Sequence, residues 1–507
     1  MYRRIRTSTA RSRPEAIAVA VFEKTAQVPS GYKALDDQGG GELGRALKRQ
    51  EFSSARDAVT ALYPSSGPGR LYVIGLGQRD KGVAQGLRQG TAALLRTLDK
   101  ARVSRVRLHL GPGLQGALGN PDAGRWAGEA FGIANFQFLD FKGAASDAPD
   151  NTARDLSVQI DGPMRSGFAR GLEIGKSVNI ARTLAAMPPN IANPAYLVRY
   201  CRRMATRSGL RCSVITAAKA AKLHMGGLLA VGRGGSSPPA VICLEHPGPP
   251  GRSRKKQKPV VLVGKAVTFD TGGYSLKPAQ SMASMKYDKC GGMAVIGALH
   301  AVAALKLPVR VVGIVPVVEN LVGQKSYRPD DIITMHNGVT VEVTNTDAEG
   351  RLILADALSH ACRAYDPSAL IDLATLTGGV VTALGSFCAG AFCAQEKLRQ
   401  GLEDAGEYSG ERLWTLPLWE EHREMLKSEH GDLVNSAGRG AHPIQGAAFL
   451  SHFTGTRGGP EGWDQRPWAH LDIAGVATTD KDTALFPKGP TGFGVRLLVR
   501  LLETWGA

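Results

Sequence analysis

Short apolar runs alternate with helix-like stretches in the first third of the chain. The runs typical of strands are 16–22, 70–74 and 103–110, and the segments with helical spacing are 80–101 and 124–132. A polar segment at 143–155, rich in Ser, Asp, Asn and Pro, predicts a surface loop. Alternation of strands and helices is typical of layered α/β domains, so we expect a smaller N-terminal α/β domain over residues 1–160.

A long helix predicted over 164–187 marks the boundary of this domain. It ends before Pro188 and Pro189, because the residue that precedes a proline disfavours helical backbone angles. We therefore expect a linker helix at 161–190 and a larger C-terminal domain over 191–507.

The second part of the chain repeats the same alternation with longer apolar runs. The strand-like runs are 259–264, 309–318, 340–344 and 369–373, and the helix-like segments are 291–305 and 352–365. The run at 309–318 is interrupted by Gly313 and Pro316. Near-continuous apolar strands separated by helices predict a central sheet, mostly parallel or mixed, that is flanked by helices on both faces.

Composition narrows the class of protein. Hydrophobic residues make up 43% of the 507, which excludes an intrinsically disordered chain. No apolar run reaches the roughly 20 residues of a membrane-spanning helix, so no membrane partner is expected. The seven cysteines are odd in number, none lies in the first 200 residues and none forms a CxxC pair. This pattern argues against a disulfide framework and favours a reducing compartment such as the cytoplasm.

The positive charge of the chain has two open interpretations. Lys and Arg number 62 against 45 Asp and Glu, a net charge of +17. Five of the seven residues at 252–258 are basic, and residues 1–13 hold five arginines and no acid. The tail is typical of an organellar transit peptide, but we favour a short basic extension before the first strand. The overall excess indicates either a nucleic-acid partner or a scattered basic surface.

Charged residues cluster where the predicted strands of the second part end. The clusters lie at 264–277, 285–288 and 345–351. Their four carboxylates, on Asp270, Asp288, Asp347 and Glu349, would repel one another in a dry cleft unless protons or cations joined them. Two divalent ions would balance the four charges, and oxygen ligands suit zinc, manganese or magnesium. The alternative is that each acid is a solvated loop residue or a helix cap.

The spacing of residues within the third cluster, 345–351, predicts its local backbone structure. Asp347 and Glu349 are two positions apart, so in an extended segment their side chains point the same way. We expect Gly350 to permit a sharp turn into a helix that begins near Leu352.

The octapeptide at 345–352, Asn-Thr-Asp-Ala-Glu-Gly-Arg-Leu, is similar to the signature of the leucyl aminopeptidase (cytosol aminopeptidase) family. Further blocks agree with that family in order and spacing, at 179–182, 188–190, 264–278, 285–288, 374–378, 383–385, 468–475 and 487–496. The resemblance covers roughly residues 175–507. The first 170 residues carry no motif that we can match.

The resemblance implies a two-metal centre. One zinc or manganese ion would be held by Lys265, Asp270, Asp288 and Glu349, and the other by Asp270, Asp347 and Glu349. The two ions would share a bridging hydroxide, and a lysine ligand would have to be neutral. Charged Lys277 would stabilise the oxyanion of the tetrahedral intermediate, and Arg351 would hold a bicarbonate that acts as general base.

The family also implies how substrates bind. The free α-amine of a peptide would bind a metal, which explains release of N-terminal residues, leucine-like ones by preference. Substrate contacts are implied at Met285, Asn345, Thr375, Leu376 and Gly378. Family members are homohexamers. This chain departs from the family at Tyr274, at Lys289-Cys290 and at 441–446, which leaves the preferred N-terminal residue open.

Two other side chains and one other function have alternative interpretations. Cys290 is expected to be a buried thiol that opens a helix rather than a nucleophile. His470 is expected to be a structural histidine. Some bacterial members of the family also bind DNA, so the basic segments at 1–13 and 252–258 are either DNA contacts or solvated charges.

Overall fold

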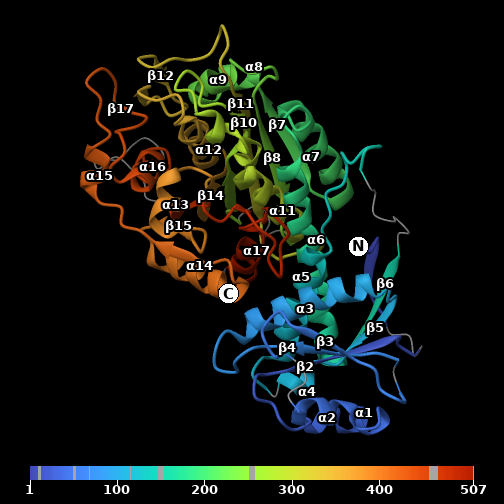
Figure 1. Ribbon diagram of the computed structural model, residues 1–507. Helices are drawn as coiled ribbons and strands as arrows, with labels where there is room; N and C mark the ends of the chain where they lie inside the picture. The colour runs from blue at the N-terminus through green and yellow to red at the C-terminus, as the bar shows by residue number, and fades with distance from the viewer. Residues whose placement is uncertain are drawn as a thin grey trace. The chain divides into compact units, whose positions relative to one another are not determined.

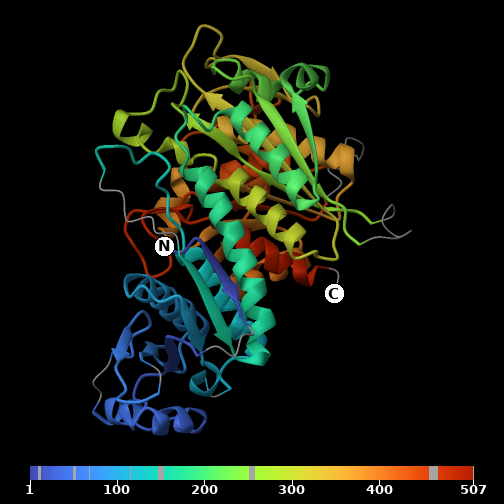
Figure 2. The ribbon, with the colours of Figure 1, turned by 90° about the vertical axis from the view of Figure 1, so that its right-hand side faces the viewer.

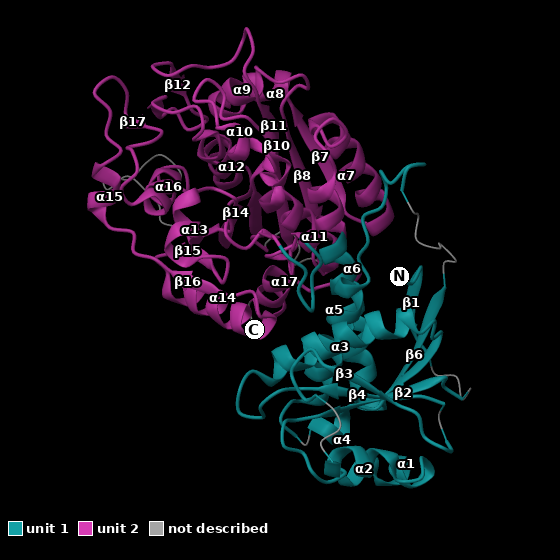
Figure 3. Ribbon diagram, viewed as in Figure 1, with its two compact units in different colours: residues 1–179, 481–488 teal, residues 180–480, 489–507 magenta. Residues whose placement is uncertain are grey.

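The computed structural model describes residues 1–8, 13–49, 53–67, 69–114, 116–146, 154–249, 257–455 and 466–505. They form two compact units (Figure 3). The first comprises residues 1–179 and 481–488, and the second comprises 180–480 and 489–507. The boundary between 179 and 180 falls inside helix α6 (Gly162–Ala186).

The first unit contains a six-stranded sheet in the order β1-β6-β5-β2-β4-β3. The strands are β1 (Arg4–Thr7), β2 (Ala16–Val21), β3 (Val59–Leu62), β4 (Leu71–Gly75), β5 (Arg105–Leu108) and β6 (Asp155–Ile160). Neighbours are parallel except for the edge pair β3 and β4. Part of the expected basic extension is therefore strand β1, in which Ile5 is buried while Arg4 and Arg6 are exposed.

Helices cover both faces of this sheet (Figure 1). They are η1 (Ser30–Tyr32), α1 (Lys33–Gln38), α2 (Glu42–Arg49), α3 (Val83–Lys100), α4 (Gly111–Leu114) and α5 (Asn120–Ala134). Ile17 and Val19 of β2 pack with Tyr32, Leu43 and Leu47 in one apolar cluster. Side chains at alternate positions of β2 thus point to the face of the sheet that α1 and α2 cover. The positions between them point to the other face, which α3 and α5 cover.

Helices α5 and α6 meet through glycines spaced four residues apart. The glycines are 124, 128 and 132 on α5 and 167, 171 and 175 on α6. A Cβ added at Gly128 would lie 2.1 Å from the carbonyl oxygen of Phe168, and one at Gly171 would lie 2.0 Å from that of Arg125. Only glycine lets the two backbones approach so closely.

We expect Gly171→Ala to destabilise the protein by roughly 3 kcal/mol, because the added methyl would meet backbone that cannot move aside. Gly162→Ala on the same helix is the control, since a Cβ there has no atom within 4 Å. Urea unfolding of both variants, followed by circular dichroism, measures the difference. Equal midpoints for the two variants would contradict close backbone packing.

The second unit contains a nine-stranded sheet in the order β16-β15-β18-β14-β9-β11-β8-β7, with β10 beside β11. The strands are β7 (Arg211–Thr216), β8 (Ala240–His246), β9 (Val260–Gly264), β10 (Ala266–Asp270), β11 (Val311–Asn320), β14 (Ala369–Ala374), β15 (Ala389–Cys393), β16 (Leu413–Thr415) and β18 (Trp468–Asp472). The central strands β18, β14, β9 and β11 are parallel, and antiparallel pairs lie toward both edges. The expected mixed, mostly parallel sheet is confirmed.

Short strands and the helices complete this unit (Figure 1, Figure 2). The short strands are β12 (Ile332–Thr334), β13 (Thr340–Glu342), β17 (Leu433–Val434), β19 (Thr478–Thr479) and β20 (Gly489–Pro490). The helices are α7 (Pro194–Ser208), α8 (Ala217–Lys222), α9 (Gly226–Gly232), α10 (Ala279–Met282), η3 (Met285–Tyr287), α11 (Cys290–Ala304), α12 (Glu349–Tyr365), α13 (Gly378–Leu384), α14 (Glu396–Ser409), α15 (Glu420–Glu424), α16 (His442–Ser451) and α17 (Val495–Thr504).

Helices α11 and α12 cover opposite faces of the sheet. Val312 and Ile314 of β11 pack with Leu352 of α12 in the main apolar cluster. A Cβ at Gly313, between them, would point toward Val295 and Leu299 of α11. The continuous apolar character of β11 follows, because both of its faces are buried.

Strand β11 runs unbroken through Pro316, where the sequence suggested an interruption. Its pairing with β9 ends at Ile314, and its pairing with β10 begins at Val317. Pro316 thus lies where the strand changes partners on that side, so its missing N–H costs no ladder hydrogen bond there.

Candidate metal centre

The parallel strands of the second unit end at one edge of its sheet and deliver polar residues there. Lys265 follows β9, Thr375 follows β14, and Asn320 and Asp270 end β11 and β10. Ligands bind at this edge in open α/β sheets. A cavity of about 580 Å³ opens here, and all twelve residues proposed from the sequence line it. They are Lys265, Asp270, Lys277, Met285, Asp288, Asn345, Asp347, Glu349, Arg351, Thr375, Leu376 and Gly378.

Three of the carboxylates form a tight cluster. Ligand oxygens of Asp270, Asp347 and Glu349 all lie within 4.8 Å of one another. Asp270 and Glu349 are almost fully buried. Burial first, and then repulsion by Asp270, raises the pKa of both Asp347 and Glu349.

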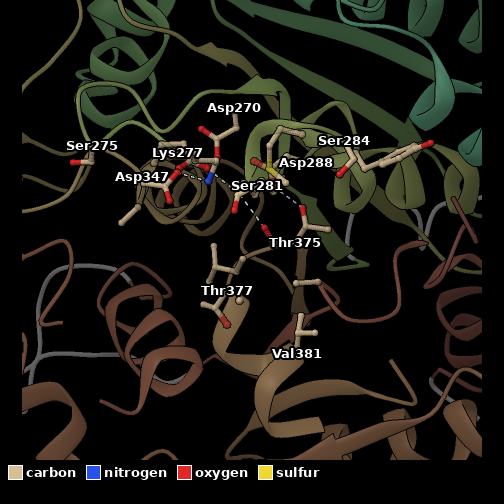
Figure 4. Close-up of a pocket in the computed structure, with 18 of the residues that line it drawn as sticks. Asp270, Ser275, Lys277, Ser281, Ser284, Asp288, Asp347, Thr375, Thr377 and Val381 are labelled. Carbon is tan, nitrogen blue, oxygen red and sulfur yellow. Dashed lines mark hydrogen bonds and ion pairs between the residues drawn. The ribbon is translucent and has the colours of Figure 1, made fainter. Parts of the chain in front are cut away.

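Two lysines partly compensate this charge. Lys277 Nζ lies 2.9 Å from Asp270 Oδ2 and also pairs with Asp347 (Figure 4). Lys265 Nζ lies 2.8 Å from Asp288 Oδ1 and 2.9 Å from Glu349 Oε1, so it joins the fourth carboxylate to the cluster. Burial disfavours both ammonium groups, but the carboxylates outweigh it and raise the pKa of each lysine.

The residues fit divalent cations. Two ammonium groups leave the four carboxylates with two uncompensated negative charges. Oδ2 of Asp288 and Oε2 of Glu349 are buried and accept no hydrogen bond within the described part of the chain. An ionised carboxylate oxygen buried without a partner is costly, and a hard cation is the ligand that removes the cost.

Gly350 has a different role from the one expected. Helix α12 begins at Glu349, three residues earlier than predicted, and Gly350 lies in its first turn without a positive φ. The expectation of a sharp turn at this glycine is therefore wrong. A Cβ at this position would lie 2.6 Å from Lys265 Nζ, so the glycine provides space for that side chain.

Asn320 is a site residue that the sequence motifs did not reveal. Its Nδ2 donates to Asp270 Oδ1 at 2.8 Å and to the carbonyl oxygen of Thr346 at 3.1 Å. Asp270 and Asn320 are also in register on neighbouring parallel strands. The amide therefore fixes one carboxylate of the cluster and the loop that carries Asp347.

We expect Asn320→Ala to lower the affinity of the cluster for a divalent metal ion by about 10- to 100-fold, the usual effect of losing a hydrogen bond that orients a ligand. Asn337→Ala is the matched control, because Asn337 also makes two hydrogen bonds but does not line this cavity. Titration of each variant with Mn²⁺ against a competing chelator measures affinity. Unchanged affinity in Asn320→Ala would contradict this role.

Arg351 and Asn435 form the next layer of the site. Arg351 Nη1 donates to the carbonyl oxygen of Asn435 at 2.8 Å, while the Asn435 side chain donates to that of Asn345 at 2.7 Å. Burial lowers the pKa of Arg351 to about 10, which leaves it charged. Its Nε is buried without a partner among the described residues, so the guanidinium retains a donor for an anion.

The residue that ends β18, Asp472, fixes the part of the cavity wall formed by Leu376 and Thr377. Asp472 accepts hydrogen bonds from the Leu376 N–H at 3.1 Å and from Thr377 Oγ1 at 2.7 Å. Thr375 Oγ1 donates to Asp288 Oδ1 at 2.8 Å (Figure 4). Gly378 then begins α13.

The other candidates fall outside this chemistry. Cys290 opens α11 as a buried thiol, as expected, and burial raises its pKa to about 12. His470 is fully buried with Nδ1 2.5 Å from Asp372 Oδ1, which agrees with a structural role. Of the basic segment at 252–258, only 257 and 258 are described, and residues 9–12 of the N-terminal tail also lie outside the described residues.

Comparison with known proteins finds relatives that cover most of the chain. The family model described as "Cytosol aminopeptidase family, catalytic domain" matches residues 179–499, and the N-terminal domain model of the same family matches residues 18–144. A probable cytosol aminopeptidase of Syntrophotalea carbinolica is 40% identical and covers 96% of this chain and 97% of its own. One from Nitrosococcus oceani is 37% identical, with 97% and 96% covered. The solved structure of the bottromycin maturation enzyme BotP in complex with Mn is 30% identical, with a TM-score of 0.82 over 97% of this chain and 99% of that one.

Proposed function

The chain belongs to the cytosol aminopeptidase family and is a metal-dependent aminopeptidase, and we propose that the cavity at the sheet edge is its active site. The observation that carries this proposal is the buried cluster of Asp270, Asp347 and Glu349. Peptides are its substrates, and we propose that N-terminal leucine-like residues are preferred.

We propose that two divalent ions occupy this cluster. Lys265, Asp270, Asp288 and Glu349 would hold one, and Asp270, Asp347 and Glu349 would hold the other. The unpartnered oxygens of Asp288 and Glu349 support this assignment. Ions held there would activate a water molecule and polarise the scissile carbonyl. As a ligand, Lys265 would give up its proton.

Lys277 and Arg351 are the proposed catalytic side chains. Lys277 remains an ammonium group at neutral pH, and we propose that it stabilises the oxyanion that develops on the scissile carbonyl. Arg351 would bind bicarbonate through its free Nε donor, and that anion would accept a proton from the attacking water. The remaining proposed contacts, from Met285, Asn345, Thr375, Leu376 and Gly378, would orient the peptide.

A metal-reconstituted activity panel tests the proposed function. We expect chelator-treated protein to lose hydrolysis of leucinamide, and Mn²⁺ or Zn²⁺ to restore it. Leucine and methionine amides should be cleaved faster than glycine or aspartate amides, and an N-acetylated peptide should not be cleaved because it offers no amine. Full activity after removal of bound metal, verified by elemental analysis, would contradict the metal centre.

Assembly, location and a second role are further proposals. A homohexamer and a cytoplasmic location follow the family, and the absence of a disulfide among the seven described cysteines is compatible with a reducing compartment. Among the described residues, no helix is both long and apolar enough to cross a membrane. DNA binding by the basic segments also stays a proposal, which the exposed Arg4 and Arg6 of β1 support.

A further inference from the structure

One wall of the cavity carries a histidine that lies outside every motif shared with the family. His442 is the first residue of α16, it lines the same cavity as the acidic cluster, and it is about half buried. It lies in the 441–446 stretch, where this sequence departs from the family pattern. No hydrogen bond within the described part of the chain involves its ring, so its nitrogens are available to a ligand.

The chain holds His442 in a defined position. Gln445, three residues later, is fully buried. Its Oε1 accepts from the Ala437 N–H at 3.0 Å, and its Nε2 donates to the carbonyl oxygens of Gly438 and Gly440. One side chain thus ties down the loop that leads into α16. Ala441 then takes a left-handed φ of 51°, which turns the chain into the helix at His442.

The first turn of α13 fixes the other side of His442. A Cβ at Gly379 would lie 2.9 Å from His442 Cβ, so the histidine packs directly against that turn. The preceding residue, Gly378, lines the cavity. Thr375 contacts Asp288 at the start of this wall, and Gly379 contacts His442 four residues later. His442 therefore lines the cavity on the same wall as Thr375 and Gly378.

The surroundings of His442 favour the uncharged form of its imidazole. Burial lowers its pKa, and the guanidinium of Arg351 on α12 lowers it further, whereas Asp472 at the end of β18 opposes the shift. A neutral imidazole offers one N–H donor and one nitrogen acceptor. This pair matches the C=O and N–H of a peptide group, whereas a carboxylate would be matched better by the nearby cations.

We propose that His442 hydrogen-bonds the peptide main chain of the substrate on the C-terminal side of the scissile bond. The inference rests on the proposed active site, in which the acidic cluster takes the N-terminal end of the peptide. The remaining part of an oligopeptide then extends along the wall formed by Gly378 and His442. An aminoacyl amide has no such part and cannot make this contact.

The test compares a substrate that reaches His442 with one that does not. In His442→Ala we expect kcat/KM for the tripeptide Leu-Gly-Gly to fall about tenfold, mainly through KM, and that for leucinamide to stay within about twofold. His442→Asn keeps a donor and an acceptor and should recover most of the loss. His430→Ala removes an exposed imidazole from the same unit and is the matched control.

Each outcome is decisive. An equal loss on both substrates would assign His442 a packing role through Gly379 and overturn the inference, as would no loss on either. Thermal melting of His442→Ala checks that α16 keeps its place. Wild-type protein that hydrolyses neither substrate after metal loading would overturn the proposed active site itself, and this inference with it.

Discussion

Asp347→Ala is expected to lower kcat/KM for leucinamide by at least about 10³-fold, about 4 kcal/mol of transition-state stabilisation. The variant removes one member of the three-carboxylate cluster and so weakens the hold on one ion. The fold should survive, because the Asp347 side chain is 32% exposed and lies in a loop before α12. Steady-state kinetics in saturating Mn²⁺ and calorimetric counting of bound ions measure the two effects.

Two comparison variants make this result interpretable. Glu349→Ala should lose activity equally but also stability, since Glu349 is buried and its removal takes a partner from Lys265. Glu396→Ala removes an exposed carboxylate on α14 and should change neither. Wild-type activity in Asp347→Ala would sink the metal assignment.

Lys277→Met is the second large effect that we expect. Its kcat should fall about 10²- to 10³-fold, as when a single oxyanion donor is lost. Methionine keeps the length and apolar part of the side chain while it removes the ammonium group that lies 2.9 Å from Asp270. Metal content should not fall, because Lys277 opposes the binding of cations rather than supplying a ligand.

Kinetics and elemental analysis on one preparation separate these effects. Lys222→Met on α8 is exposed and changes the net charge by the same amount, so it controls for charge alone. Loss of metal in Lys277→Met would show that this lysine supports the ions instead. An unchanged kcat would exclude it as the oxyanion donor.

Patterning along the chain was enough to predict much of the fold. Apolar or β-branched runs predicted β9, β11 and β14, because a strand that is buried on both faces is apolar along most of its length. Strand β1 was not predicted from the sequence, because Ile5 is its only buried residue and lies between exposed arginines. The sequence also did not predict that β11 continues through Pro316, because this continuity depends on which strand lies beside that residue.

The candidate site likewise contains residues that the sequence predicted and residues that it did not. Residues within the motifs converge on one cavity, because each motif follows a strand or opens a helix at the same sheet edge. Asn320 and Asn435 support the site through partners 50 and 90 positions away in the sequence, so no local spacing reveals them. Gly350 was recognised as important for the wrong physical reason, because its constraint comes from Lys265 rather than from its own turn.

The pairing of Lys265 and Lys277 with the carboxylates has a consequence for how the site responds to pH. The chain's own ammonium groups offset part of the carboxylate charge, so these acids can be buried together at a lower electrostatic cost. A divalent ion held by Lys265 would take the place of the proton on its amine, so we expect metal affinity to increase as the pH rises.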